Sequence, residues 1–221
     1  NDLGYMNQNV KIVGRNSGIT YSELGATHHS LEDFAIMRMI PGTVVLAPQD
    51  PGEIRSAVKA MLEHQGPVYM RIGNSPIPQL WEEQKFEIGK GRILREGKDL
   101  TIISTGTTTL QALEAAELLD KQNVSAMVIG MPTVCPVDEE LIIKAAQITG
   151  KLMTVEEHYQ YGGLGTMVAE VCCREYPVPI KMHGIPKTYA TSGPYDELLR
   201  YYRLDADGIA DTALEFIKKF I

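Results

Sequence analysis

Short apolar runs, many of them rich in β-branched residues, alternate with helical patterns along most of this chain. Strands are expected at residues 9–14, 43–48, 67–72, 100–104, 125–130, 151–157 and 178–185. Helices are expected at residues 30–39, 51–64, 137–147 and 207–220, and after the turns at 105–109 and 161–165. Strand–helix alternation is typical of a mostly parallel sheet that helices cover on both faces, so the sequence predicts an α/β fold.

The alternation breaks once, over residues 73–91, where prolines, glycines and the only tryptophan gather. We expect this stretch to pack against the rest of the protein, because Trp81 and Phe86 would otherwise be exposed. The break predicts two three-layer α/β/α units with mostly parallel sheets. The expected limits are residues 1–76 for the first unit, 77–91 for a connector and 92–221 for the second unit.

Composition argues against several classes of function. The chain has 221 residues, of which 44% are hydrophobic and 22% charged, and its net charge is −7. No basic face favours a nucleic-acid partner, and no apolar run approaches the roughly 20 residues that a membrane-spanning helix needs. Cys135, Cys172 and Cys173 lack the spacing of a disulfide framework or a metal site. They predict buried, reduced thiols in a cytoplasmic protein.

Three motifs that follow expected strands are interpreted as structural. The turns "YGGLG" (161–165) and "TGTTT" (105–109) precede helices, whose N-termini attract anions, but neither completes a dinucleotide or P-loop pattern. We expect both turns to let a helix pack close to the sheet. "EEH" (156–158) does not fit a metal site, because consecutive strand residues point in different directions. Solvated polar residues at a strand end, or an interface contact, are expected there.

Two adjacent histidines, His28 and His29, stand just before the helix expected at 30–39. If Thr27 or a neighbour caps that helix, its first turn presents free N–H groups and the positive end of the helix dipole. His28 could then donate to an anionic or hydroxylated ligand, while Gly25 would let a substrate approach the backbone. A purely structural role for His28 is equally compatible with the pattern. His29 is expected to pack or to support the cap.

The stretch "GATHHSLEDFAIMRMIPGTVVLAPQDPGE" and the later "GPVYMRIGNSP" resemble the pyrimidine-binding domain of transketolases. The shared pattern is a Gly-x-Thr-His-x-x-x-Glu turn, Arg-x-x-Pro, Pro-x-Asp-x-x-Glu at a helix start and Arg-x-x-Asn at a strand end. Residues 92–221, with "TVEEH" and "GGLG", are similar to the C-terminal domain of the same thiamine-diphosphate enzymes. The resemblance is most specific over residues 20–76.

This resemblance implies transfer of a two-carbon ketol unit from a ketose to an aldose, with sugars or sugar phosphates as substrates. His28 matches the family histidine that hydrogen-bonds substrate hydroxyls beside the thiazolium ring. Arg71 matches an arginine that grips the acceptor's phosphate, for which a guanidinium fork is suited. The chain departs from the family at Asn16, which replaces a phosphate-contacting histidine, and at Leu24, which replaces an aspartate that contacts a sugar hydroxyl.

The resemblance also implies that the first unit is incomplete at its N-terminus. Asn1 corresponds to a point in the middle of the pyrimidine-binding domain, after the glutamate that protonates the cofactor's pyrimidine. Residues that hold thiamine diphosphate and Mg²⁺ are therefore expected upstream of Asn1 or on a partner, and no metal ligands are expected in the chain itself. The expected partner is an N-terminal diphosphate-binding subunit or domain, in a homodimer or a heterotetramer.

Three other interpretations stay open. The β subunit of 2-oxoacid dehydrogenases and deoxyxylulose-phosphate synthase share both domains with transketolase. Arg71 together with Asn74 favours transketolase over the dehydrogenase subunit, which has no need of a phosphate-binding arginine there. A non-catalytic dimerisation module of the same fold is the third alternative.

Overall fold

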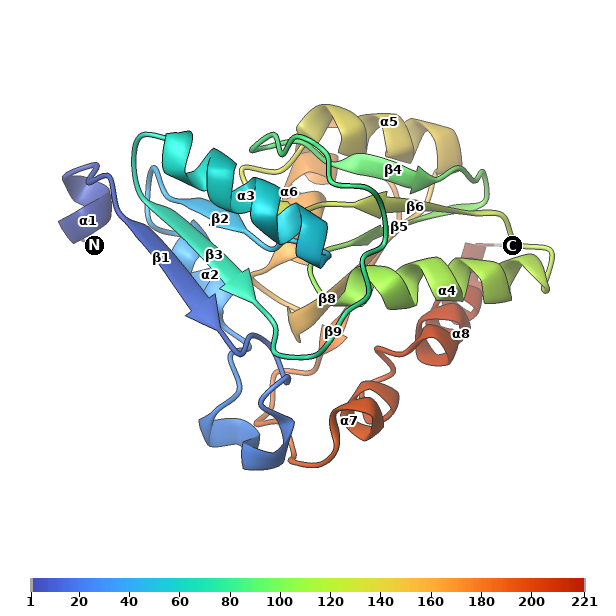
Figure 1. The fold of residues 1–221 in the computed structure, drawn as a ribbon. Coiled ribbons are helices and arrows are strands. Elements are labelled where there is room, and N and C mark those ends of the chain that lie inside the picture. Colours follow the sequence, from blue (N-terminus) through green and yellow to red (C-terminus); the bar gives the residue numbers. More distant parts are fainter. Residues whose placement is uncertain (1, 221) are drawn as a thin grey trace.

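The computed structural model describes residues 2–220 and contains two β-sheets that lie next to each other (Figure 1). The first sheet has the strand order β1-β3-β2-β7. In it, β1 (Lys11–Arg15), β3 (Val68–Ile72) and β2 (Val44–Leu46) are parallel, and β7 (Thr133–Cys135) is antiparallel to β2. The second sheet has the order β4-β6-β5-β8-β9.

In the second sheet only the edge strand β4 (Arg92–Arg95) is antiparallel to its neighbour. Its parallel strands are β5 (Leu100–Ser104), β6 (Ala126–Gly130), β8 (Leu152–Tyr159) and β9 (Ile180–Ile185). The helices are α1 (Asp2–Tyr5), α2 (Asp33–Arg38), α3 (Pro51–Glu63), α4 (Thr108–Asp120), α5 (Glu139–Thr149), α6 (Leu164–Glu175), α7 (Tyr195–Tyr201) and α8 (Ala206–Ile217). Two 3₁₀ helices, η1 (Ser22–Thr27) and η2 (Lys218–Phe220), complete the described chain.

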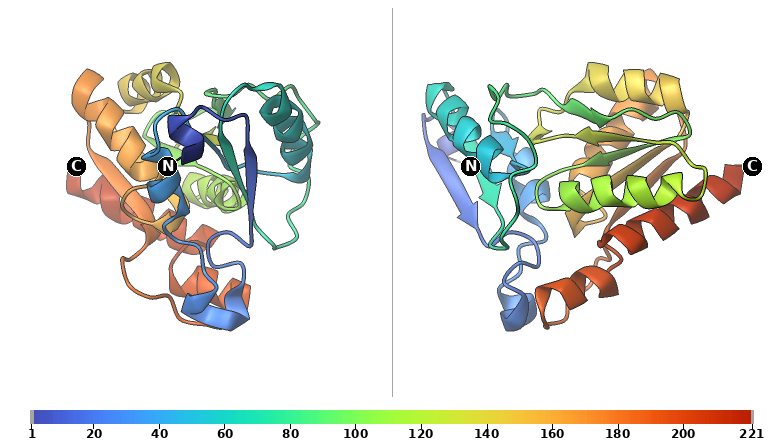
Figure 2. Two further views of the ribbon diagram at one scale, coloured as in Figure 1. Left: turned by 90° about the vertical axis from the view of Figure 1, so that its left-hand side faces the viewer. Right: turned by 45° about the vertical axis from the view of Figure 1, so that its right-hand side comes forward.

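Helices cover both faces of each sheet, which confirms the predicted α/β fold (Figure 2). In the second unit, α4 and α8 pack on one face through small residues such as Ala112 and Ala213, and α5 and α6 cover the other. In the first unit, α3 packs on one face through Met61, and Phe34 of α2 packs on the opposite face. Burial of these apolar side chains is the largest favourable contribution to the free energy of folding, at roughly 25 cal/mol per Å² of apolar surface removed from water.

The seven expected strands are all present, whereas β4, β7 and α7 were not expected. β7 is the most consequential of these, because Thr133–Cys135 lies within the expected second unit but pairs with β2 of the first sheet. The limits 1–76, 77–91 and 92–221 stay a prediction. One short segment of chain nevertheless crosses from the second half of the sequence into the first sheet.

The connector packs down as predicted. The buried side chain of Asp50 caps α3 by accepting a hydrogen bond from Glu53 N (2.7 Å), and its other oxygen accepts one from Leu80 N (2.8 Å). The Trp81 ring stacks on the guanidinium of Arg92, whose carbon lies 4.7 Å from the ring centroid. Asp50 thus fastens the connector to the start of a helix.

The thiols only partly match the expectation, since Cys172 is buried but Cys173 is exposed, and the three cysteines are free. None of the helices described between residues 2 and 220 has the length and apolar character required to cross a membrane.

Replacing Asp50 by alanine should destabilise the protein by about 2–4 kcal/mol. It removes a helix cap, worth about 1 kcal/mol, and leaves the partly buried N–H groups of Leu80 and Trp81 without an acceptor. The control is Asp205→Ala, which removes only the cap on Gly208 N and should cost about 1 kcal/mol. Urea unfolding measures both losses. Tryptic cleavage after the exposed Lys85 should accelerate only in Asp50→Ala; equal cleavage of the two variants would contradict this role.

Candidate functional site

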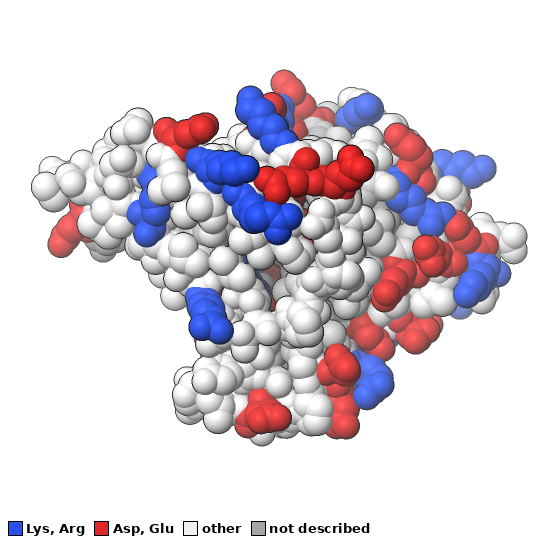
Figure 3. All heavy atoms as spheres, viewed as in Figure 1, with Lys and Arg blue, Asp and Glu red and all other residues white. Residues whose placement is uncertain are grey.

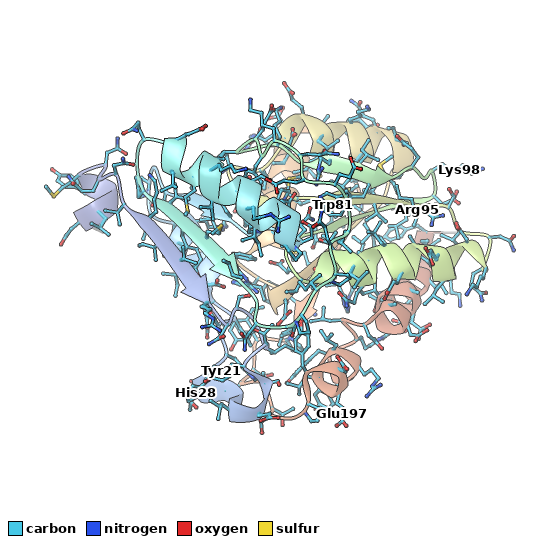
Figure 4. All side chains as sticks on the ribbon, viewed as in Figure 1. Tyr21, His28, Trp81, Arg95, Lys98 and Glu197 are labelled. Carbon is cyan, nitrogen blue, oxygen red and sulfur yellow. The ribbon has the colours of Figure 1, made fainter. Side chains whose placement is uncertain are left out.

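His28 lies on a loop that leaves the first sheet after β1 and closes on itself. Gly18 N donates to Ser30 O (3.0 Å) and Ser30 N donates to Gly18 O (2.9 Å), so these two residues form the base of the loop. We call residues 18–30 the His28 loop; it contains η1. Figure 4 shows Tyr21 and His28 together on this loop, with Glu197 of α7 at the same end of the molecule.

The His28 side chain is exposed, and its backbone ends η1 rather than starting a helix. Its N–H donates to Gly25 O (2.9 Å), and its ring Nδ1 lies 2.9 Å from the Thr27 hydroxyl. Tyr21 packs edge-on against the ring at a centroid distance of 5.5 Å. These contacts orient the imidazole and leave its Nε2 for a ligand.

The predicted helix start at the histidines is wrong. α2 begins at Asp33, Glu32 occupies the N-cap position without a side-chain cap bond, and the Thr27 hydroxyl contacts the His28 ring instead. The residues before α2 instead form the Gly18–Ser30 bridge, which competes with helix formation for their backbone groups. Any ligand of His28 is therefore bound by the side chain without help from a helix dipole.

His29 is half-buried, and both of its ring nitrogens are shielded from solvent without a hydrogen-bond partner among residues 2–220. Burial is the main cause that lowers the pKa of His29; the nearby backbone of Ser22, too poorly aligned for a regular hydrogen bond, opposes it, and His28 adds to the lowering. The ring is thus held neutral inside the loop. This placement agrees with the packing role expected for His29.

Gly25 has a positive φ of 69°, which favours glycine, and it faces the second unit. A Cβ at this position would lie 3.1 Å from the Cβ of Ser192, and Gly193 N donates to Ser22 O (3.2 Å). The close approach that Gly25 permits is therefore to the segment before α7. Its predicted contact with a substrate stays a prediction.

Polar side chains gather at the carboxyl ends of β1 and β3, the edge of an α/β sheet at which ligands commonly bind. Asn16 adopts a left-handed conformation (φ 60°), and its Oδ1 is buried with no donor among the described residues. The exposed Arg15 donates to Asn74 Oδ1 (3.2 Å) across the two strands. The Asn16 oxygen is thus shielded and without a donor, and Arg15 is a cation that sequence analysis missed.

Arg71 does not present an open guanidinium fork. It is only 5% exposed, and its Nη1 donates to Asp33 Oδ1 (2.8 Å) while its Nη2 donates to Glu157 O (2.7 Å). The Phe34 ring lies under the guanidinium at 4.2 Å. Phosphate binding by Arg71 stays a prediction, but the structure shows this residue joining the first unit to the second. Asp33, which neutralises its charge, was not foreseen.

The "EEH" motif is buried, so the expectation of solvated polar residues is wrong. Glu156, Glu157 and His158 are 0%, 2% and 0% exposed. Glu156 accepts hydrogen bonds from Leu164 N and Gly165 N (2.8 Å each) at the start of α6. Glu157 points away from Glu156 as predicted, but His158 does not: its Nδ1 lies 3.9 Å from Glu156 Oε2, and its ring stacks on Phe34 of α2 at 5.2 Å. Their continuity with the apolar run 152–155 was the available signal of burial.

The glycine-rich turn before α6 is structural, as expected. Its helix N-terminus is already occupied by the Glu156 carboxylate, an internal anion. A Cβ on Gly165 would lie 2.8 Å from both Thr154 and Met182, so the glycine brings α6 close to the sheet. No external phosphate is needed to account for this turn.

Residues 2–220 contain no group of three or more His, Cys, Asp or Glu side chains that could hold a metal ion. A small cavity of about 70 Å³ does lie at the junction of the two units, where Arg71, Glu157 and Thr107 line it. Its two carboxylates, from Asp50 and Glu157, make it a poor site for a diphosphate.

Glu156 gives the protein a pH dependence that can be measured. Burial raises the pKa of Glu156 to about 7, opposed by the N–H groups of Gly165 and Leu164. Because this pKa lies above the ordinary value of 4.5, its stabilising contribution is full below pH 4.5 and is lost as pH rises through 7. Glu156→Gln has no carboxyl group to ionise at this position. Between pH 4.5 and 7, its free energy of unfolding minus that of wild type should therefore increase by up to about 3 kcal/mol. Urea unfolding at several pH values measures the difference, and exposed Glu83→Gln should show no such rise.

Comparison with known proteins identifies the family of this chain. Residues 1–78 match the family described as "Transketolase, pyrimidine binding domain", and residues 89–209 match "Transketolase, C-terminal domain". The chain is 44% identical over 220 residues to an apulose-4-phosphate transketolase subunit of Phocaeicola vulgatus, covering 99% of this chain and 70% of that protein. It is 42% identical over 223 residues to a putative transketolase C-terminal section of Methanocaldococcus jannaschii, with coverage of 99% and 70%.

A solved structure described as a split gene transketolase, inactive β4 tetramer, superposes with a TM-score of 0.90. It is 39% identical, and the match covers 97% of this chain and 69% of that one. Nearly the whole chain thus has the fold of this split transketolase. The chain belongs to the transketolase family, in which it corresponds to the C-terminal section.

Proposed function

We propose that this chain supplies the substrate-facing part of a transketolase that transfers a two-carbon ketol unit from a ketose to an aldose. The observation that carries the proposal is the exposed His28, which the Thr27 hydroxyl and the Tyr21 ring orient. An imidazole held in this way can hydrogen-bond a sugar hydroxyl and stabilise charge that develops on it during carbon–carbon bond cleavage. The proposed substrates are sugars or sugar phosphates.

The family is thiamine diphosphate-dependent, and bound cofactor supplies the nucleophilic carbon and the electron sink of the reaction. We propose that residues outside this chain hold the diphosphate and Mg²⁺, since residues 2–220 offer no cluster of metal ligands. The described residues would instead act on the sugar. His28 would bind its hydroxyl groups, and the Asn16 amide would donate a further hydrogen bond through its nitrogen, since its oxygen is shielded.

A partner subunit would complete this site. Figure 3 shows charged side chains of both signs over the upper and right parts of one face, whereas the lower left, over β1 and η1, is mostly uncharged. Apolar side chains are exposed on these elements: Ile12 is 38% and Val13 49% accessible on opposite faces of the edge strand β1, and Leu24 is 49% accessible in η1. Exposed apolar surface of this kind is typical of an interface. We propose that an N-terminal diphosphate-binding subunit or domain docks on this face, in a cytoplasmic homodimer or heterotetramer.

The purified chain alone should therefore be inactive. Ketol transfer from hydroxypyruvate to glycolaldehyde should appear only when the N-terminal partner, thiamine diphosphate and Mg²⁺ are all added. The similar split transketolase, which is described as an inactive β4 tetramer, supports this expectation. Transfer by the chain alone would contradict the proposed division of the site. A complete mixture without activity would instead favour a non-catalytic dimerisation module.

His28→Ala in the complete enzyme should lower kcat/KM by roughly 30- to 1000-fold, the effect of losing a hydrogen bond worth about 2–4 kcal/mol in the transition state. Because His28 is exposed, the melting temperature should stay within about 1 °C of wild type. The matched control is His29→Ala, which changes an enclosed ring and should alter stability more than catalysis. If only His29→Ala impaired turnover, the assignment of His28 would be wrong.

A further inference from the structure

We propose that Glu157, on β8 of the second unit, is a positioning residue for the His28 loop. The proposal rests on the proposed function for its catalytic consequence, but not for its structural basis. Nothing in the family resemblance gave this glutamate a role, and its burial was not expected. Its side chain points toward the base of the loop, away from the face that Glu156 serves.

The Glu157 carboxylate joins three separate segments of chain. Its Oε1 accepts a hydrogen bond from Ile19 N (2.6 Å), at the base of the His28 loop. Its Oε2 accepts one from the Thr107 hydroxyl (2.6 Å), before α4, and one from the Tyr195 hydroxyl (2.8 Å), in α7. Hydrogen bonds to a buried carboxylate are among the stronger ones in proteins. The carboxylate is thereby fixed from two sides and holds the loop with its remaining oxygen.

The loop approaches Glu157 as closely as a backbone can. Gly18 has a φ of 61°, and a Cβ at this residue would overlap the Glu157 carboxylate. At the other end of the loop, Tyr159 N donates to Leu31 O (3.1 Å). The same strand of the second sheet thus holds both ends of the segment that carries His28.

The far side of the loop rests on the segment that Glu157 also anchors. Ser192 contacts Gly25, Gly193 N donates to Ser22 O, and Tyr195, a few residues later, donates to Glu157. Figure 1 shows η1 and α7 next to each other at the bottom of the molecule. A shift of the carboxylate would therefore move the base of the loop and its support together.

The contacts at the base of the His28 loop determine where the loop lies, because few of its own side chains are buried. Ile19 and Leu31 are buried at its base, whereas most side chains from Tyr21 to His28 are exposed. Few buried contacts then oppose local motion, so the fixed points at the base decide where His28 lies. A displacement of about 1 Å in a group that positions substrate can cost about a hundredfold in rate.

The test compares Glu157→Ala with Glu156→Ala in the full chain assembled with its partner, thiamine diphosphate and Mg²⁺. Glu156 is the matched control, because it is adjacent, equally buried and also accepts backbone hydrogen bonds, but from α6. Hydrogen–deuterium exchange of peptides covering residues 17–31 reports on the loop, and peptides covering β5 and β6 report on the core. Ketol transfer from hydroxypyruvate to glycolaldehyde is measured well below the melting temperature.

Exchange in residues 17–31 should rise at least tenfold in Glu157→Ala and stay near wild type in Glu156→Ala, although both variants lose stability. kcat/KM should fall between about tenfold and a hundredfold in Glu157→Ala alone. Glu157→Gln keeps an acceptor oxygen for Ile19 N and should restore most of both readouts. If Glu157→Ala does not fold, Glu157→Asp, whose carboxylate is one methylene shorter, carries the same comparison.

A double-mutant cycle separates this proposal from the proposed function. His28→Ala should lower kcat/KM much less in the Glu157→Ala background than in wild type, because the loop is already displaced there. Additive losses, or loop exchange that is unchanged in Glu157→Ala, would overturn the positioning role while leaving the function of His28 intact. An unchanged rate in His28→Ala alone would overturn the proposed function, whereas the exchange measurement would still decide how the loop is held.

Discussion

A guanidinium that is buried away from water needs a negative charge and hydrogen-bond acceptors beside it. Arg71, which lies between the two units, has both. Asp33 supplies the opposite charge, the carbonyl of Glu157 accepts a second N–H, and the Phe34 ring covers the face. Breaking a buried pair of this kind typically costs about 3–5 kcal/mol, because one charge stays unpaired. The first sheet, α2 and β8 are thus held in one arrangement.

The end of β8, whose backbone binds Arg71, is polar although it is buried, because its side chains have partners within the protein. Glu156 caps α6, Glu157 holds the His28 loop, and His158 stacks on Phe34 of α2. Glu156 and His158 share one face of the strand, 3.9 Å apart, and Glu157 points to the other face, as the alternation of a strand requires. Burial holds His158 neutral, lowering its pKa to about 4, so it adds no second positive charge beside Arg71. The strand end serves as a junction rather than as a surface.

The sequence predicted the fold well where its signals are long and periodic. Strand 126–130 is a run of apolar residues, strand 100–104 is rich in β-branched ones, and Asp50 before Pro51 marks a helix start. β7 was not predicted, because Pro132 and Pro136 flank its 3 residues and mark the segment as a loop, whereas the equally short β2 lies in the longer run 43–48. The exposed position of His28 followed from no local pattern either. It depends on the Gly18–Ser30 bridge and on Glu157, which are contacts between residues distant in the sequence.

The prediction of a helix at the paired histidines shows the same limit. Ser30 and Leu31 have acceptable helix propensity, but Ser30 pairs with Gly18 and Leu31 accepts a bond from Tyr159. Tertiary contacts override the local preference and delay the helix to Asp33. The sequence pattern could therefore indicate a ligand-binding role for His28. It could not predict that Arg71 is buried against Asp33 and Glu157, because these residues are distant from it in the sequence.

The pairing of β7 with β2 constrains how this protein could be recombined with its relatives. A chimera joined within the connector would exchange residues 133–135 along with the rest of the second half, and so would replace an edge strand of the retained first sheet. Val45 would then face a foreign strand across a register that already carries an irregularity beside it. Modular exchange of the two halves is thus limited by three residues that belong to one half in sequence and to the other in structure.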